Sequence, residues 1–186
     1  LLQHVTSLWI HPQYQHICAS GGLIHAAQYQ GGIGNLARTG IAFYGYGYEE
    51  LLPALRCTTK LIQIKEIQPG ESIGYDGTYR AEKPMKIGVL PIGYHDGMDR
   101  RLSSTWVVGL GDAICPIVGR VSMNLTTIDI SDVSDAQVGD EVIYISEDKY
   151  SPLSLERQSE CAQMIPYDML VHLNKEMFRT VSWGTK

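Results

Sequence analysis

Apolar and polar residues follow two different patterns along the chain. In the first part they predict a strand ending at 15–20, a short helix at 23–30 and a second strand at 35–45. Glycine pairs separate these segments. A strand, a helix and a strand in close succession are typical of one βαβ unit, so residues 1–45 are expected to belong to an α/β domain.

After this part the pattern changes to short β-type segments separated by turn residues, as in Gln68-Pro69-Gly70-Glu71. The expected strands are 61–65, 86–92, 105–108, 117–122, 125–130 and 141–146. Several short strands at this spacing favour an antiparallel barrel or sandwich. We therefore expect a mostly β C-terminal domain over residues 46–186.

Two helices and a strand are predicted near the end of the chain. Ser151-Pro152 fits an N-cap followed by proline at the first helical position, which predicts a helix as far as Met164. Pro166 is expected to open a second helix that runs through Leu173. Residues 177–183 are expected to return as a strand.

Composition and charge narrow the class of partner. The 186 residues are 44% apolar and 19% charged, which is enough apolar material for a packed core. The net charge of -5 provides no basic surface, which argues against nucleic acid as a partner. No apolar run approaches the ~20 residues of a membrane span, and no signal peptide is evident. We expect a cytoplasmic protein, or the cytoplasmic part of a membrane-anchored one.

The cysteines and histidines do not predict a metal site. The four cysteines are far apart and form no zinc-type spacing, so they are expected to behave as small apolar residues in a reducing compartment. His95 and Asp96 are too few ligands for a metal ion.

Five motifs carry the candidate chemistry. They are Ala37–Gly45, Gly70–Tyr79, Leu90–Gly97, Ile117–Asn124 and Ile165–Leu170. Each motif alone is weak, but together, in this order and spacing, they resemble the alanine racemase family over nearly the whole chain. That family joins a TIM-type barrel to a β-domain, uses pyridoxal 5'-phosphate (PLP) and works as a homodimer.

The resemblance implies that residues 1–45 are the last strands of the barrel, a short α/β remnant. The earlier strands, including the one with the Schiff-base lysine, are expected to lie outside this chain. The isolated chain is therefore expected to be inactive. The implied reaction interconverts the L- and D-forms of alanine, serine or both.

Tyr75 matches the tyrosine that the family uses as one of two bases on opposite faces of the substrate. A free tyrosine has a pKa of about 10, so such a base needs a cationic or hydrogen-bonding neighbour to act near neutral pH. The alternative is a tyrosine that merely packs at a strand end. The surrounding motif favours the catalytic role.

Arg38 matches the arginine that hydrogen-bonds the PLP ring nitrogen. Because arginine does not give up its proton, it would leave that nitrogen unprotonated and the cofactor a weaker electron sink, which suits a racemase. His16 matches a histidine that supports this arginine. A surface arginine and a structural histidine are the alternatives.

Residues that match the phosphate contacts of the family are Ser20, Gly40, Ile41 and Tyr167. Hydroxyls and backbone N–H groups are the donors that a phosphate needs. Ala19 stands where the family usually has asparagine, which departs from the phosphate-binding pattern. Ordinary strand or turn positions are the alternative for each residue.

Met123 matches a residue whose backbone N–H meets the substrate carboxylate, and Tyr94 matches a tyrosine that lines the narrow entrance. In the family these two residues and the catalytic tyrosine complete the site of the partner subunit. The resemblance therefore implies that Tyr75 and Arg38 of one chain serve different sites of a homodimer.

Asn124 departs from the family, where aspartate usually follows the methionine. A neutral amide adds two donors, which would suit a serine hydroxyl. This is similar to the membrane-anchored serine/alanine racemases linked to vancomycin resistance. Two further alternatives are the related decarboxylases, which lack the Gly-Tyr-x-Asp-Gly pattern, and a non-catalytic β-domain for dimerisation or binding.

Overall fold

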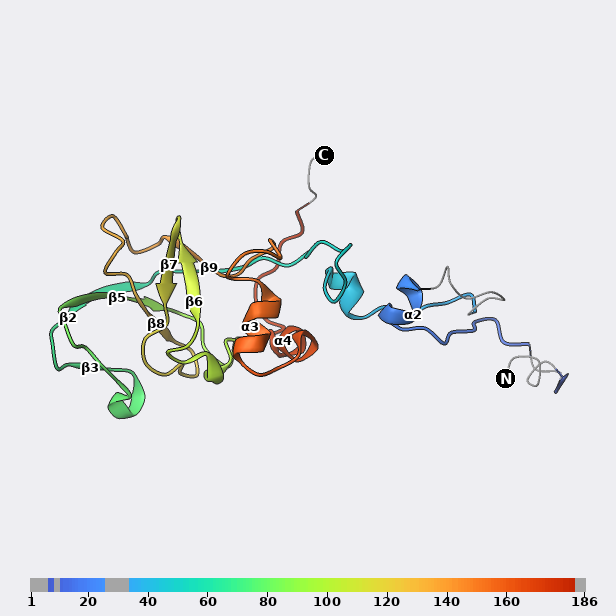
Figure 1. Cartoon of the computed structure of the whole chain (residues 1–186), viewed down its shortest axis with the longest axis horizontal. Coiled ribbons are helices and arrows are strands. Elements are labelled where there is room, and N and C mark those ends of the chain that lie inside the picture. The colour runs from blue at the N-terminus through green and yellow to red at the C-terminus, as the bar shows by residue number, and fades with distance from the viewer. Residues whose placement is uncertain (1–6, 9–10, 26–33, 183–186) are drawn as a thin grey trace. The chain divides into compact units, whose positions relative to one another are not determined.

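The protein is described by a computed structural model that covers residues 7–8, 11–25 and 34–182 and divides the chain into two compact units (Figure 1). The first unit is Leu1–Pro53 and the second is Ala54–Lys186. Within the described part of the chain, no helix has the length and apolar character needed to cross a membrane.

The described residues of the first unit include the short helix α2 (Ser20–Ile24) and the 3-10 helix η2 (Ile41–Tyr44). The predicted strand at 15–20 is wrong, because only isolated bridges at His16 form there and Ser20 already begins α2. The predicted strand at 35–45 is also wrong.

Interactions at both ends of η2 favour a helical turn over a strand. The hydroxyl of Ser20 accepts hydrogen bonds from the amides of Gly40 and Ala42, and Gly45 ends the turn in the left-handed conformation with φ 81°. The predicted helix at 23–30 begins too late, and residues 26–30 lie outside the described part.

The second unit is mostly β. One sheet has the strand order β1 (Cys57–Lys60), β9 (Glu141–Ile145), β6 (Val107–Leu110) and β7 (Ala113–Pro116). Another has the order β2 (Gln63–Ile67), β5 (Met85–Leu90) and β8 (Thr126–Asp129), and a hairpin joins β3 (Ser72–Ile73) to β4 (Tyr79–Arg80) (Figure 1). The pairings between these strands are antiparallel, which confirms the mostly β character.

One part of the core forms where the central strand β5 meets the β3–β4 hairpin. A buried cluster joins the two elements and consists of Ile73, Ala81, Met85, Ile87 and Val118. Because β5 lies between β2 and β8, burial of its apolar side chains fixes the hairpin against the sheet. Three of the cysteines, Cys18, Cys57 and Cys115, are also buried, and all four are free thiols.

Several predicted strands correspond to observed ones. The segments 125–130 and 141–146 contain β8 and β9, and 86–92 covers β5 except for its first residue, Met85. The segments 61–65 and 105–108 overlap β2 and β6 with a shift along the chain. The strand predicted at 117–122 is wrong. Only Ile117 makes a bridge, and Gly119 takes the left-handed conformation with φ 78°, which interrupts a strand.

The second unit also contains the helices α3 (Leu155–Cys161) and α4 (Pro166–His172). The cap of α3 is Ser154, whose hydroxyl accepts the amide of Arg157, so the predicted start at Ser151-Pro152 is three residues early. The start of α4 at Pro166 is confirmed. Residues 177–182 form no strand, and Trp183 lies outside the described part.

Candidate active site

Ser20 lies at the centre of a small donor cluster in the first unit. Its side chain is 3% exposed, and its hydroxyl oxygen accepts hydrogen bonds from the amide of Gly40 at 3.1 Å and of Ala42 at 3.3 Å. Ile41, between these amides, is buried and holds the turn against the unit. The sequence-predicted residues Ser20, Gly40 and Ile41 are therefore brought together, with two backbone N–H groups aimed at one oxygen atom.

Arg38 and His16 stand on neighbouring stretches of chain. The amide of Arg38 donates to the carbonyl of Cys18 at 2.9 Å, and His16 forms bridges to Gly34 and Leu36. The side chains of Arg38 and His16 are both exposed. The backbone thus brings the two candidate residues to adjacent segments and leaves their side chains open to a ligand.

Tyr75 opens the 3-10 turn η3 (Tyr75–Gly77), which connects β3 to β4. The β3–β4 register pairs Ile73 with Tyr79, so the hairpin holds both ends of the turn. The side chain of Tyr75 is 68% exposed and extends from the core-packed hairpin. The phenol of Tyr75 is therefore open to solvent rather than packed in the core.

The turn that carries Tyr75 rests on the backbone of Gly119 and Arg120. A Cβ atom on Gly74 would lie 3.1 Å from the amide nitrogen of Arg120, and one on Gly119 would lie 2.8 Å from the carbonyl oxygen of Ile73. Asp76 adds an ion pair with Arg120 at 2.6 Å. The absence of side chains at Gly74 and Gly119 permits this close approach.

Tyr94 and Met123 stand on two segments that are hydrogen-bonded to each other. The amide of Tyr94 donates to the carbonyl of Ser122 at 3.0 Å, and the amide of His95 donates to the carbonyl of Met123 at 3.0 Å. Asp96 closes the first segment, because its carboxylate accepts the amide of Gly93 at 3.0 Å. This hydrogen bond gives Asp96 a structural role in the motif.

Met123 and Asn124 occupy the tip of a turn. The amide of Ser122 donates to the carbonyl of Leu125 at 2.9 Å, and the Ser122 hydroxyl bonds Leu125 as well. Both tip residues are exposed. The segment 119–124 thus carries the turn of Tyr75 at one end and the contacts of Tyr94 at the other, which brings four predicted site residues to one stretch of backbone.

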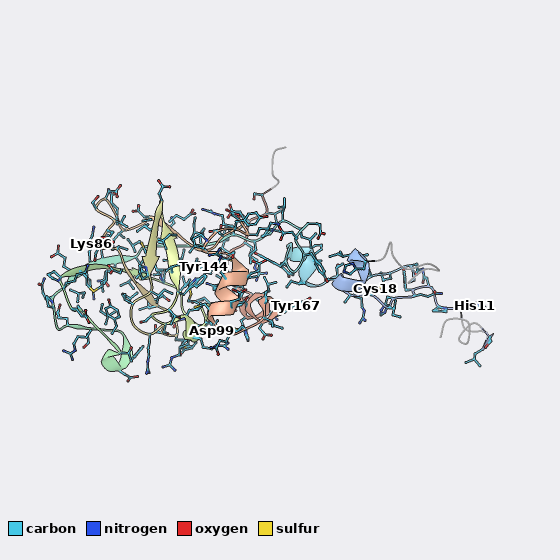
Figure 2. All side chains as sticks on the ribbon, viewed as in Figure 1. His11, Cys18, Lys86, Asp99, Tyr144 and Tyr167 are labelled. Carbon is cyan, nitrogen blue, oxygen red and sulfur yellow. The ribbon has the colours of Figure 1, made fainter. Side chains whose placement is uncertain are left out.

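Tyr167 lies on the first turn of α4 and is 48% exposed (Figure 2). The end of the same helix packs against the Tyr94 loop, since a Cβ atom on Gly97 would lie 3.1 Å from the carbonyl oxygen of His172. The helix is therefore fixed to the segment that bears Tyr94.

A hollow lined by arginines was not predicted from the sequence. Its lining residues are Arg100, Arg101, Ser103 and Arg120. Arg101 pairs with Asp99 at 2.9 Å, and this hydrogen bond holds the pKa of Asp99 below its ordinary value. The sequence signal that could have predicted this hollow is the run Asp99-Arg100-Arg101, which follows the third motif, together with Arg120 in the fourth motif. The hollow adjoins the backbone on which the Tyr75 turn rests and favours an anion.

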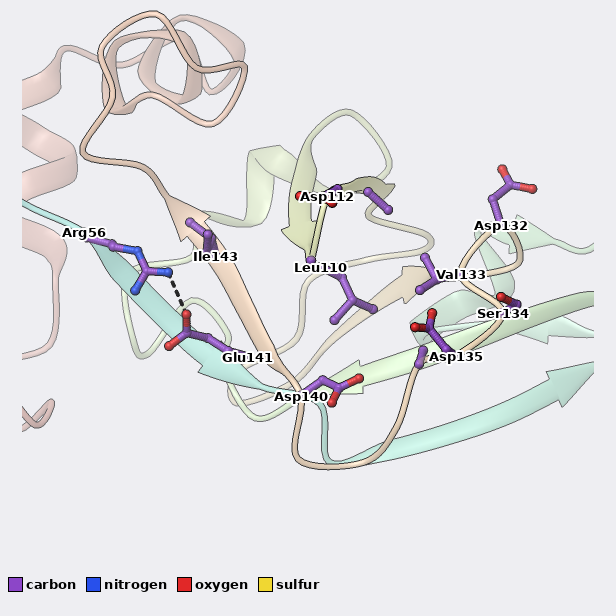
Figure 3. A pocket seen from close by; sticks show the side chains of 13 residues that line it. Arg56, Leu110, Asp112, Asp132, Val133, Ser134, Asp135, Asp140, Glu141 and Ile143 are labelled. Atoms are coloured by element: carbon purple, nitrogen blue, oxygen red, sulfur yellow. Dashed lines mark hydrogen bonds and ion pairs between the residues drawn. The ribbon is translucent and has the colours of Figure 1, made fainter.

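A second hollow has the opposite charge (Figure 3). Its acidic lining residues are Asp112, Asp132, Asp135, Asp140 and Glu141, with one arginine, Arg56, paired to Glu141 at 2.6 Å. None of the predicted site residues lines it. An anionic amino-acid carboxylate is expected to prefer the arginine hollow to this one.

The β-sheets, the order of the motifs and the exposed tyrosines define a racemase-type C-terminal β-domain, and comparison with known proteins agrees. Residues 54–181 match the model of the family described as alanine racemase, C-terminal domain. The chain therefore belongs to this family.

Two curated relatives illustrate the similarity. The alanine racemase of Thermodesulfovibrio yellowstonii is 36% identical over 155 residues, which cover 83% of this chain and 42% of the relative. The alanine racemase of Staphylococcus carnosus is 34% identical over 178 residues, which cover 91% of this chain and 45% of the relative. The chain thus spans less than half the length of these relatives.

Solved structures show the same fold. Alanine racemase from Bacillus anthracis with bound L-Ala-P superposes with a TM-score of 0.79 at 29% identity, over 92% of this chain and 45% of that one. Alanine racemase from Bartonella henselae with covalently bound pyridoxal phosphate gives a TM-score of 0.77 at 27% identity, over 94% of this chain and 48% of that one.

Proposed function

We propose that this chain is the C-terminal part of a PLP-dependent amino-acid racemase and that it supplies the tyrosine base. The observation that carries the proposal is the shared backbone segment 119–124, which supports the turn of Tyr75 and is hydrogen-bonded to the turn of Tyr94. The exposed side chains of Tyr75, Tyr94 and Met123 extend from these segments toward solvent, where a substrate site would be completed by other parts of the enzyme.

The residues present fit the phosphate of PLP. The amides of Gly40 and Ala42 converge on the hydroxyl oxygen of Ser20, which accepts both and keeps its own proton to donate. Hydroxyls and backbone N–H groups of this kind bind phosphate oxygens. Within the first unit, Ser20, Gly40 and Ile41 would hold the phosphate, Arg38 would bond the ring nitrogen, and His16 would support Arg38. Tyr167, which belongs to the second unit, is proposed as a further phosphate contact on the family resemblance alone. When bound, the cofactor disperses the negative charge that develops at the substrate Cα.

In the proposed reaction, one residue of this chain transfers a proton and another retains its protons. As a phenolate, Tyr75 would take the proton from Cα on one face of the substrate and become the phenol, and as the phenol it would return a proton to the same face. Arg38 keeps its guanidinium protons and so leaves the ring nitrogen of the cofactor without one. A lysine on the opposite face, contributed by the remaining part of the enzyme, is the second base.

Substrate entry and orientation follow from charge and exposure. The arginine hollow next to the Tyr75 turn attracts the carboxylate of an amino acid. The backbone N–H of Met123 meets that carboxylate, and Tyr94 narrows the approach. We expect these residues to complete the site of a second copy, so that a homodimer is the active form.

Alanine is the primary substrate in this proposal, and Asn124 supports serine as a second one. The side chain of Asn124 is exposed at the tip of the Ser122–Leu125 turn, next to Met123. An amide there would donate to a serine hydroxyl, whereas aspartate would only accept. The narrower expectation of a membrane-anchored serine/alanine racemase rests on this residue alone, while the relatives described above are alanine racemases.

The substrate proposal is tested with Asn124→Asp in the full-length gene product that contains this sequence. If Asn124 bonds the hydroxyl, the ratio of serine to alanine racemisation falls by about five-fold or more, the value of one hydrogen bond. An unchanged ratio contradicts the role of Asn124 and leaves alanine as the substrate.

The racemase proposal is tested on the same full-length protein with PLP, by following the conversion of L-alanine to D-alanine. Tyr75→Phe is expected to lower kcat by about 100-fold or more, the usual contribution of a general base. Tyr150→Phe is the matched control, because Tyr150 is 71% exposed and lies outside the motifs. Absence of racemisation by the wild-type protein would instead support a non-catalytic β-domain for dimerisation or binding.

A further inference from the structure

We propose that Asp76 is a positioning residue for Tyr75, acting through a left-handed backbone conformation that an ion pair fastens to Arg120. This inference rests on the proposed function of Tyr75 as a base. Asp76 follows Tyr75 directly and lies in the same turn, η3. The Asp76 side chain pairs with Arg120, so any effect of Asp76 on the reaction is exerted through the placement of Tyr75.

The backbone of Asp76 has an uncommon conformation. Its φ is 61° and its ψ is 9°, while Gly74 and Gly77 on either side of the Tyr75–Asp76 pair also have positive φ values, of 77° and 57°. Left-handed residues are disfavoured for most side chains, but aspartate, asparagine and glycine accept them. Asp76 therefore sets the direction in which the chain leaves Tyr75, and with it the direction of the phenol.

The ion pair fastens this conformation to a fixed support. The Asp76 carboxylate lies 2.6 Å from the guanidinium of Arg120. The backbone on both sides of Arg120 is held by hydroxyls, since Ser104 accepts the amide of Gly119 and Ser103 accepts the amide of Val121, each at 3.0 Å. The arginine is thus anchored from both neighbours, and the turn is tied to it.

The pair is poorly suited to a purely structural role. The Arg120 and Asp76 side chains are 37% and 69% exposed, and ion pairs at such positions add little to global stability. The turn itself carries no buried residue. Loss of the pair is therefore expected to change where Tyr75 lies and to leave the fold intact.

The first test needs neither cofactor nor activity. The 186-residue chain is labelled with 3-fluorotyrosine, and its Tyr75 fluorine resonance is assigned by its loss in Tyr75→Phe. Asp76→Ala and Arg120→Gln are expected to shift or broaden this resonance, while the other tyrosine resonances stay in place and report an intact fold. Asp76→Asn, which still accepts the left-handed conformation, is expected to move it least. An unchanged Tyr75 resonance in Asp76→Ala overturns the inference.

The second test measures kcat and KM of the full-length protein with PLP. Asp76→Ala is expected to lower kcat by about ten- to 100-fold with little change in KM, since small misplacements of a reacting group have effects of this size. Asp76→Asn is expected to recover most of the loss. Asp112→Ala, a change at an exposed aspartate on the β6–β7 turn, is the matched control and is expected to match the wild type.

A double variant separates positioning from a general structural effect. In the Tyr75→Phe background, Asp76→Ala is expected to add no further loss, because the two residues act as one unit. The same ten-fold loss in both backgrounds overturns the inference. If Tyr75→Phe itself has no effect, the proposed function fails, and the fluorine resonance still decides whether Asp76 orients Tyr75.

Discussion

Gly93 lies against the backbone of Met123, so closely that a Cβ atom on Gly93 would stand 2.5 Å from the carbonyl carbon of Met123. Two backbone hydrogen bonds, from Tyr94 to Ser122 and from His95 to Met123, join the same segments. The missing side chain at Gly93 is therefore a condition for bringing together Tyr94 and Met123, the residues proposed to line the entrance and to bind the substrate carboxylate.

Gly93→Ala tests this close approach. Because the obstructing atoms belong to the backbone and have little room to move, we expect a loss of about 1–3 kcal/mol in the free energy of unfolding. Chemical denaturation of the 186-residue chain measures it. Gly109→Ala is the control, since its new Cβ atom would come closest to the end of the Leu153 side chain, at 2.9 Å, and would meet Ile143 only at an ordinary contact distance of 3.8 Å. Equal losses in the two variants would contradict the account of the Tyr94–Met123 contact.

Ser20→Ala tests the phosphate cluster in the first unit. The change removes the hydroxyl that accepts the amides of Gly40 and Ala42 and that is proposed to donate to the phosphate. We expect the dissociation constant for PLP in the full-length protein to rise by about five- to 30-fold, the effect of one or two hydrogen bonds. Absorbance titration measures it, with Ser134→Ala as the control. An unchanged constant would place the phosphate elsewhere.

Asp99→Asn tests the pH dependence of the arginine hollow. The Asp99 carboxylate accepts the side chain and the amide of Arg101, and these bonds lower the pKa of Asp99 in the folded chain. A lowered folded pKa contributes stability that is present above the unfolded value of about 3.9 and is lost as the pH falls through the folded value.

The wild-type chain is therefore expected to exceed Asp99→Asn in free energy of unfolding at pH 7, with the difference shrinking below about pH 4. Urea unfolding at a series of pH values measures both curves, and Asp112→Asn serves as the control. A difference that stays constant down to pH 2 would show that charge on Asp99 does not matter.

The predictable part of the fold was the part with strong local patterns. The predicted apolar segments match β5, β8 and β9, which are central or well-buried strands. Pro166 marks the start of α4 by its local sequence alone. Strand β1, with the sequence Cys57–Lys60, was missed because it is an edge strand with few apolar residues. Its pairing with β9 comes from residues more than eighty positions away.

The sequence motifs predicted which residues are candidates for the site. They did not predict the hydrogen bonds, backbone conformations and ion pairs that hold these residues in place. The turn at η2 was taken for a strand because Ile41, Phe43 and Tyr44 are β-formers, whereas the hydroxyl of Ser20 and the conformation of Gly45 favour a helical turn. The pairing of Asp76 with Arg120 likewise joins residues that are 44 positions apart. Local sequence patterns do not encode such contacts.

The most direct test of the account is exchange of the Cα hydrogen of alanine in D₂O, measured for each enantiomer with the full-length protein and PLP. With two bases on opposite faces, the wild-type protein exchanges and inverts both enantiomers. Tyr75→Phe is expected to keep exchange of one enantiomer, lose that of the other by about 100-fold or more, and lose inversion. Exchange of both enantiomers at the wild-type rate in Tyr75→Phe would contradict the central claim that Tyr75 is one of the two bases.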